Sequence, residues 1–159
     1  APALKVLDVG TGSGALGITA ALELGLKTVY LSDIDAKALA VAKQNTQALQ
    51  QPAEFFQNDL FHFNNADFDV LLCNLPYVPD SFQINTAALH EPRLAIFGGP
   101  DGLDLYRKLF AQTKTANKNP RYILTESMPP QHDELAAIAA AQGYDAQTED
   151  DFIQVFCSK

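Results

Sequence analysis

Short apolar runs alternate along the chain with longer segments whose apolar positions follow a helical period. Their spacing predicts strands at 4–9, 28–31, 55–56, 68–73, 122–125, 144–148 and 152–157. The intervening segments predict helices at 15–24, 35–49, 101 or 102 to 116, and 130–142, each close to a capping residue or a glycine. This alternation indicates a doubly wound α/β sheet, in which the last two strands form a hairpin around residues 149–151.

The segment 76–100 breaks this rhythm. It contains four prolines and ends in the turn sequence Gly98-Gly99-Pro100. Connections of this length without regular structure are usually lids or binding loops. We therefore expect it to border a functional site.

Composition narrows the possible functions. The chain has 159 residues, which suits one domain, and carries 11 Lys and Arg against 19 Asp and Glu, a formal net charge of −8. Nucleic-acid-binding proteins usually present a basic face to phosphates, so this balance favours a protein or small-molecule substrate over a nucleic acid. No apolar stretch is long enough for a membrane helix and no signal peptide is evident, so we expect a cytoplasmic protein without a membrane partner.

The two cysteines and the start of the chain lead to two further expectations. Cys73 and Cys157 lie inside apolar runs without companion ligands, so we expect neither a disulfide framework nor a metal site. The chain has no initiator Met and reaches a strand-like run at Leu4, so we expect a domain excised or processed from a longer protein.

The first motif with chemical content is a glycine-rich turn between the first strand and the first helix. Glycines allow a tight turn and a close approach to a ligand, and the helix start offers free N–H groups. Gly12, Gly14 and Gly17 also match the dinucleotide fingerprint, which is weak by itself, and a purely structural turn is a further alternative. Asp8 favours S-adenosylmethionine, because a carboxylate suits the ammonium and sulfonium groups of that cofactor and would repel a pyrophosphate. The turn comprises Asp8, Val9, Gly10, Thr11, Gly12, Ser13 and Gly14.

Acidic side chains follow the second and third predicted strands. Asp33 lies nineteen positions after Gly14, where an acidic residue binds ribose hydroxyls in nucleoside-binding sheets. Asp35 competes for this role but better suits the N-cap of the next helix, so we assign the ribose to Asp33. Asn58-Asp59-Leu60 follows the third strand, where a carboxylate can meet the adenine amino group; a turn or capping aspartate is the alternative.

Asn74-Leu75-Pro76-Tyr77 ends the fourth predicted strand and is the most specific motif. The Asn74 side-chain oxygen and the Leu75 carbonyl can each accept one N–H of a planar amide or amine. Pro76 stiffens the turn so that both oxygens converge, and Tyr77 offers an aromatic face for a flat group. Such a nitrogen is a poor nucleophile. We therefore expect its alignment with a methyl group to lower the activation barrier, by on the order of 7 kcal/mol or more in favourable cases. The motif therefore predicts N-methylation, unless it merely ends a strand.

With these motifs the chain resembles the class I methyltransferases, and more closely the HemK family of release-factor glutamine methyltransferases. Residues 8–17, 32–39 and 58–61 are similar to that family's cofactor motifs, and 90–103 to the stretch after its catalytic motif. The resemblance implies a mostly parallel seven-stranded sheet with helices on both faces and an antiparallel last strand. It also implies S-adenosylmethionine as the cofactor, bound by Asp8, Gly10, Thr11, Gly12, Ser13, Gly14, Asp33, Ile34, Asn58, Asp59, Leu60 and Asn74.

The resemblance further implies methyl transfer to the glutamine side-chain amide in the Gly-Gly-Gln loop of a translation release factor. Residues 1–159 are then the catalytic domain, without the family's N-terminal helical domain that helps to grip the release factor. Leu75 stands where the family usually has a proline, and Asn-Leu-Pro-Tyr is also similar to the motif of rRNA adenine dimethyltransferases. The sequence leaves open the oligomeric state and the roles of Glu91 and Arg93.

Four functions follow from these features. A protein-glutamine methyltransferase is the leading hypothesis, on the run 91–103 and the acidic charge. A nucleic-acid adenine or other amine methyltransferase rests on residues 74–77 alone. A nicotinamide-dependent oxidoreductase rests on the glycines at 12, 14 and 17. A cofactor-binding module without activity rests on the absent helical domain.

Overall fold

The structure is a computed structural model that describes residues 4–63, 65, 67–83, 95–116 and 118–159. Within these residues the chain forms seven strands, four α-helices and one short 3₁₀ helix. In chain order they are β1 (Val6–Val9), α1 (Ala15–Leu24), β2 (Val29–Asp33), α2 (Ala36–Ala48), β3 (Ala53–Gln57), β4 (Val70–Cys73), α3 (Asp104–Thr113), β5 (Tyr122–Glu126), η3 (Pro129–Gln131), α4 (His132–Ala141), β6 (Tyr144–Asp150) and β7 (Ile153–Ser158).

The seven strands form one sheet in the order β3-β2-β1-β4-β5-β7-β6. Strands β1 to β5 pair in parallel, whereas β7 is antiparallel to both of its neighbours. The chain winds outward in one direction from β1 and in the other from β4, and ligands of such sheets bind in the crevice at this switch point. The predicted doubly wound, mostly parallel seven-stranded sheet with an antiparallel last strand is confirmed.

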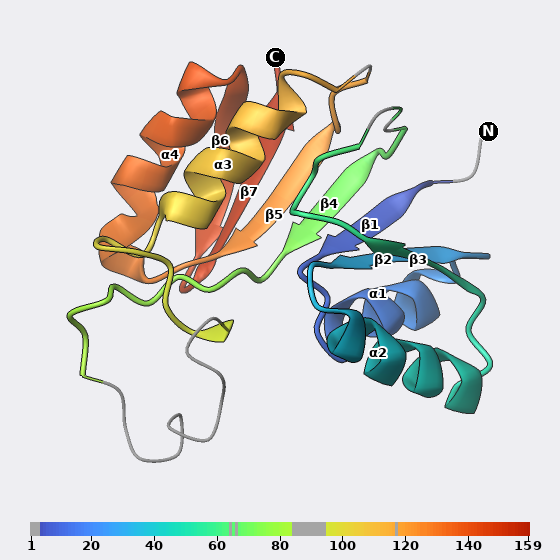
Figure 1. Ribbon diagram of the computed structural model, residues 1–159. Helices are drawn as coiled ribbons and strands as arrows, with labels where there is room; N and C mark the ends of the chain where they lie inside the picture. The colour runs from blue at the N-terminus through green and yellow to red at the C-terminus, as the bar shows by residue number, and fades with distance from the viewer. Residues whose placement is uncertain (1–3, 64, 66, 84–94, 117) are drawn as a thin grey trace.

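Helices cover both faces of the sheet, with α1 and α2 on one side and α3 and α4 on the other (Figure 1). Alternate residues of a strand point to opposite faces, so neighbouring positions belong to different cores. Leu31 joins the smaller core under α1 and α2, whereas Leu7, Leu71 and Ile123 join the larger core under α3 and α4. None of the helices in the described ranges is long and apolar enough to cross a membrane.

An aromatic cluster covers the larger core where β3 leads into β4. The described residues of this connection form no helix. Phe61, Phe63 and Phe68 pack against one another and against Tyr30 and Phe56, with ring centroids 5.3–6.4 Å apart. Most of these pairs are edge-to-face, an arrangement that adds attraction beyond the area buried. The cluster thereby fixes the loop that leaves β3.

The start of the third predicted helix is wrong by two or three residues. α3 begins at Asp104. Before it, Gly102 has a φ of 81°, and Asp101 Oδ1 accepts a hydrogen bond at 3.0 Å from the backbone N–H two residues later. This side-chain-closed turn replaces the predicted first helical turn.

The last hairpin also turns later than predicted. β6 continues through Asp150, and the turn consists of Asp151 and Phe152. Asp151 has a φ of 51°, and aspartate is one of the few residues that accept this left-handed conformation in a two-residue hairpin turn. The prediction placed the turn at the run of acidic residues, whereas the pairing continues through two of them.

Candidate active site

The loop between β1 and α1 turns back over the end of β1. Gly10, Gly12 and Gly14 have φ values of 69°, 56° and 84°, a conformation that residues with a Cβ rarely adopt. Gly17 is required for another reason, because a Cβ there would lie 2.6 Å from Cδ2 of Leu31. The glycines therefore shape the loop and let α1 pack directly on the sheet.

Asp8 supports this loop from below. Its side chain is 2% exposed, and Oδ2 accepts hydrogen bonds from Thr11 Oγ1 at 2.6 Å and from Gly17 N at 2.9 Å. Burial raises the pKa of Asp8 to about 6, against the opposing effect of the two hydrogen bonds, and the charge of Asp33 adds a small further increase. Asp8 therefore holds the loop together. Its predicted contact with the cofactor stays a prediction.

The outer side of the loop is open. A Cβ on Gly12 would meet no atom within 4 Å, and Ser13 is exposed. Gly14 caps α1 without a side-chain hydrogen bond, and in the described part of the chain the N–H groups of Ala15 and Leu16 bind no protein acceptor. Unpaired N–H groups at a helix start attract a carboxylate.

Asp33, at the end of β2, contacts the same loop. Its Oδ2 accepts a hydrogen bond from Gly12 N at 2.8 Å, and its Oδ1 accepts one from Asp35 N at 2.9 Å. Each carboxylate oxygen has a further lone pair, so ribose hydroxyls can still bind there. Asp35 caps α2 by accepting from Lys37 N at 2.8 Å, which confirms its predicted role. Ile34 between them is 68% exposed, and the cofactor contacts of both Asp33 and Ile34 stay predictions.

The loop after β3 lies beside Asp33, but its side chains have partners. Asn58 N donates to Asp33 O at 3.0 Å, and Asn58 Oδ1 accepts from Asp59 N at 3.0 Å. The Asp59 carboxylate forms an ion pair with Lys108 of α3, and Leu60 is buried in the larger core. An adenine amino group would therefore share the Asp59 carboxylate with Lys108.

The chain leaves β4 in a turn that presents two oxygens. The Leu75 side chain is 2% exposed, and its Cδ2 lies 2.9 Å from the position of a Cβ on Gly10, so it packs against the glycine loop. Asn74 is exposed. Within the described residues, neither the Asn74 side chain nor the Leu75 carbonyl is hydrogen-bonded to another group. Both predicted acceptors are therefore available beside the loop.

The neighbouring strand holds Tyr77. Its hydroxyl donates to Glu126 Oε1 at 2.8 Å, and Glu126 ends β5, which pairs with β4. Burial, followed by this hydrogen bond, raises the pKa of Tyr77 to about 12. The phenol is therefore neutral near pH 7 and does not act as a base there.

A second glycine-rich turn packs against the outside of the motif. A Cβ on Gly98 would collide with the carbonyl of Pro76, and a Cβ on Gly102 would collide with the carbonyl of Tyr77. The buried Gln131 side chain completes this support by donating from Nε2 to Tyr77 O at 2.8 Å. Gly98 and Gly102 are therefore needed for backbone-to-backbone packing on the turn 74–77.

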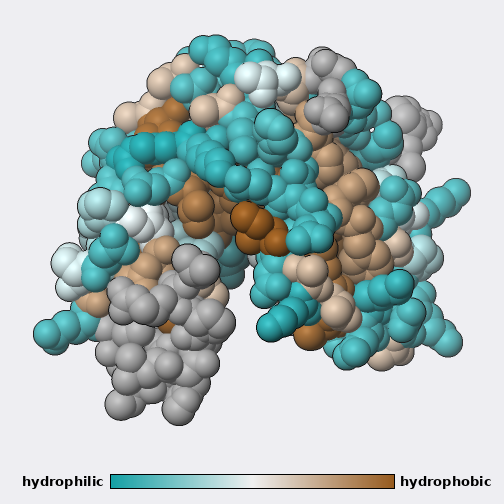
Figure 2. Space-filling model, viewed as in Figure 1, coloured by the Kyte–Doolittle hydropathy of each residue, from teal (hydrophilic) through white to brown (hydrophobic). Residues whose placement is uncertain are grey.

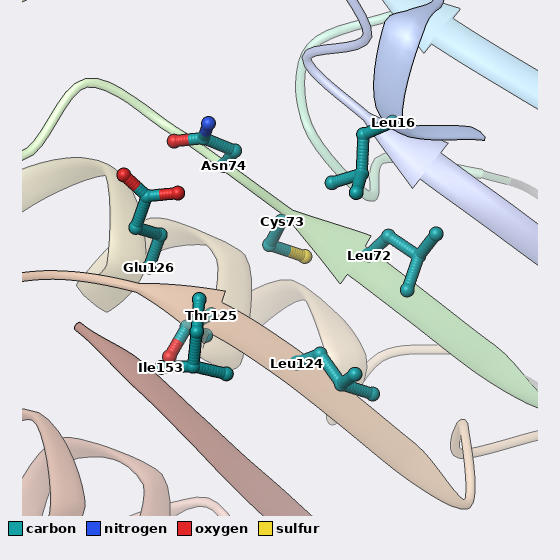
Figure 3. A pocket seen from close by; sticks show the side chains of 8 residues that line it. All are labelled: Leu16, Leu72, Cys73, Asn74, Leu124, Thr125, Glu126 and Ile153. Carbon is teal, nitrogen blue, oxygen red and sulfur yellow. The ribbon is translucent and has the colours of Figure 1, made fainter. Parts of the chain in front are cut away.

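A pocket opens where β4 and β5 end (Figure 3). Asn74 and Glu126 project from the two strand ends on one side, and Leu16 of α1 faces them from the other. Apolar side chains gather in a hollow at this place in the space-filling view (Figure 2). An apolar floor with a few polar groups at the rim is typical of small-molecule sites. The lining residues are Leu16, Leu72, Cys73, Asn74, Leu124, Thr125, Glu126 and Ile153.

The structure thus gathers the predicted motifs at the carboxyl ends of β1, β2, β3 and β4, although Thr11 and Leu60 turn inward. The sequence interpretation assigned no role to Glu126, although an acidic residue at the end of a strand is a recognisable feature. It also missed Gln131, which no local pattern distinguishes. Glu91 and Arg93 lie outside the described residues.

Comparisons with known proteins find similarity to methyltransferases. Residues 2–91 match the family model described as methyltransferase small domain. A release factor glutamine methyltransferase of Bacillus cereus is 41% identical over 115 residues, covering 69% of this chain and 41% of that protein. A ribosomal protein uL3 glutamine methyltransferase of Bordetella pertussis is 41% identical over 115 residues, covering 67% and 38%. The crystal structure of a ribosomal protein L11 methylase from Lactobacillus delbrueckii subsp. bulgaricus aligns with a TM-score of 0.68 at 21% identity, covering 99% and 71%.

The fold is that of the class I methyltransferases. The chain belongs to the methyltransferase small domain family, and its predicted resemblance to the HemK release-factor glutamine methyltransferases is confirmed. It spans about two fifths of the length of the two glutamine methyltransferases described above, 41% and 38%.

Asp8→Asn should flatten the dependence of stability on pH. The pKa of Asp8 is about 6 in the folded protein against an ordinary 3.8, so the folded state holds this proton more tightly and loses stability as pH rises from about 4 to 6. The variant lacks this titrating group, so its stability relative to that of the wild type should rise by up to about 3 kcal/mol between pH 4 and pH 6. Urea unfolding at several pH values between these limits measures the slope. Asp35→Asn, at an exposed cap that asparagine also satisfies, is the control, and an unchanged slope in Asp8→Asn would contradict the prediction.

Gly102→Ala should destabilise the protein by more than the positive φ of Gly102 alone explains. Gly143 has a similar φ, 88° against 81°, but a Cβ there would meet nothing within 4 Å. Gly143→Ala therefore measures the conformational cost, about 1 kcal/mol. Gly102→Ala adds the collision with Tyr77 O, worth about 1–3 kcal/mol more. Thermal unfolding of both variants checks this, and equal losses would mean that the turn moves away freely.

Proposed function

We propose that the chain is the catalytic part of an S-adenosylmethionine-dependent N-methyltransferase that modifies a glutamine side-chain amide in a protein. The end of β4 carries the proposal. There, among the described residues, the Asn74 side chain and the Leu75 carbonyl are unpaired beside the glycine loop. A primary amide has two N–H donors on one nitrogen, which can match these two acceptors on consecutive residues.

The loop after β1 and the end of β2 fit the cofactor. The unpaired N–H groups at the start of α1 suit a carboxylate, and the open side of Gly12 leaves room for close approach. Asp33 has lone pairs left for ribose hydroxyls. S-Adenosylmethionine supplies a methyl group on a sulfonium, which is electrophilic enough to react with an amide nitrogen. The predicted contacts at 8, 10–14, 33–34 and 58–60 are retained as part of this proposal, and Asn74 is assigned mainly to the acceptor amide.

The residues of the chain contribute positioning. Asn74 and Leu75 each accept one amide N–H, which sets the plane of the amide and aims its nitrogen at the methyl group. Tyr77, neutral and held by Glu126, gives a flat face against which the amide packs. The cofactor would supply the methyl group to this nitrogen and keep the electron pair of the broken carbon–sulfur bond on sulfur, and the amide proton that is lost would pass to water. No strong base is needed when alignment supplies the rate.

We propose the glutamine of a Gly-Gly-Gln loop in a translation release factor as the acceptor, with the protein acting in the cytoplasm. Two relatives with similar sequences are named release factor glutamine methyltransferases, which supports this choice of acceptor. A formal net charge of −8 also suits a basic protein partner better than a nucleic acid. Because a uL3 glutamine methyltransferase is equally similar, a glutamine of a ribosomal protein is the comparison substrate.

Asn74→Ala and Asp33→Ala should separate turnover from cofactor binding. Asn74→Ala removes one of two acceptors for the amide, so kcat should fall about a hundred-fold or more while the Kd for S-adenosylmethionine stays within about two-fold. Asp33→Ala should mainly raise that Kd, by on the order of ten-fold or more. Methyl transfer to a Gly-Gly-Gln peptide and calorimetric titration measure the two effects. Equal loss of both in Asn74→Ala would remove Asn74 from the acceptor site.

Calorimetric titration of the chain with S-adenosylmethionine and, separately, NAD tests the cofactor. We expect binding of the former alone, in the micromolar range. Preference for NAD would favour an oxidoreductase. Cofactor binding without methylation of a release-factor or uL3 peptide would favour a binding module, and methylation of adenine in RNA would favour a nucleic-acid enzyme.

A further inference from the structure

One buried hydroxyl lies directly behind the motif turn. Tyr106, on the inner side of α3, has its Oη 2.6 Å from the carbonyl oxygen of Glu126 and 3.0 Å from that of Cys73. The same Oη accepts a longer hydrogen bond from Leu75 N at 3.4 Å. The side chain is fully buried, and this burial raises the pKa of Tyr106 well above its ordinary value. The phenol therefore stays protonated, and its one hydrogen is shared between the two carbonyls, which lie at 2.6 Å and 3.0 Å.

These contacts flank Asn74 on both sides. The Cys73 carbonyl belongs to the peptide group before the Asn74 Cα, and the Leu75 N–H belongs to the peptide group after it. Two peptide groups held by one oxygen fix φ and ψ of Asn74, and with them the direction of its Cα–Cβ bond. The next carbonyl along the chain is that of Leu75, the second acceptor. The position of the Tyr106 hydroxyl therefore affects both acceptors, the Asn74 side-chain oxygen and the Leu75 carbonyl oxygen.

We propose that Tyr106 is a positioning residue for methyl transfer, because its hydroxyl fixes the backbone around Asn74 and so aims both acceptors at the substrate amide. Glu126 is the anchor on the next strand. Its carbonyl accepts from Tyr106, and its carboxylate accepts from Tyr77. Two tyrosines thus join one residue of β5 to the two ends of the motif turn. The inference rests on the proposed function, since it concerns how that site is aimed.

Tyr106→Phe removes the hydroxyl and keeps the ring. We expect kcat for methyl transfer to a Gly-Gly-Gln peptide to fall on the order of ten-fold or more, because misplacement by about 1 Å can cost a hundred-fold. The Kd and KM for S-adenosylmethionine should stay within about two-fold, since the glycine loop and Asp33 are untouched. Each enzyme is assayed well below its own unfolding midpoint.

Tyr144→Phe is the matched control. Tyr144 is also fully buried in the larger core, and its hydroxyl donates to Pro120 O at 3.1 Å, a contact that involves none of the site residues. Both variants lose a buried hydroxyl, so both should unfold at lower temperature, but only Tyr106→Phe should lose kcat. A kcat in Tyr106→Phe no lower than in Tyr144→Phe would overturn the proposal.

Amide hydrogen exchange of Leu75 separates this inference from the proposed function. We expect Leu75 N–H to exchange on the order of ten-fold faster in Tyr106→Phe than in Tyr144→Phe or the wild type. If the wild type methylates no acceptor, the proposed function fails. The exchange data alone then test whether Tyr106 holds the turn around Asn74. Faster exchange confined to Tyr106→Phe then supports its hold on the turn, and equal exchange in both variants overturns it.

Discussion

The position of β4 between β1 and β5 is the constraint on which the site depends. The three strands run parallel and in register, with Val9 opposite Cys73 and Cys73 opposite Thr125. The residues that follow them, Gly10, Asn74 and Glu126, therefore emerge side by side at one edge of the sheet. Backbone hydrogen bonds between the strands set their spacing. The glycine loop, the turn at Asn74 and the Glu126 carboxylate therefore come together without any contact between their own side chains being needed.

Glycines allow the backbone to approach this edge closely from two directions. On one side, Gly10 leaves room for the Leu75 side chain, and Gly17 lets α1 lie against the sheet. On the other side, Gly98 and Gly102 bring a second turn against the carbonyls of the motif. These glycines meet two different needs. Gly10 and Gly102 have a positive φ as well as too little space for a Cβ, whereas Gly17 and Gly98 are needed only because there is no space for a Cβ.

Leu75 shows how the motif tolerates a change of side chain. The family usually has a proline here, but the predicted contact with substrate is made by the backbone carbonyl, which leucine also has. The leucine side chain is used for something else, because it is buried in the larger core and against Gly10. The proline that remains, Pro76, is half-buried, with its carbonyl facing Gly98. Packing from both sides thus replaces part of the stiffness that a second proline would give.

The amino-acid sequence was enough to predict the sheet, the order of its elements along the chain and the places where the candidate motifs lie. Hydrophobic period and glycine placement are local properties, and motifs that follow strands must meet at one edge of a parallel sheet. Tertiary structure alone decided the support of the site. Tyr106 reaches Cys73 across 33 positions, Tyr77 reaches Glu126 across 49, and Gln131 reaches Tyr77 across 54. Such hydrogen bonds depend on how α3, β5 and the segment before α4 pack, and no local pattern records that.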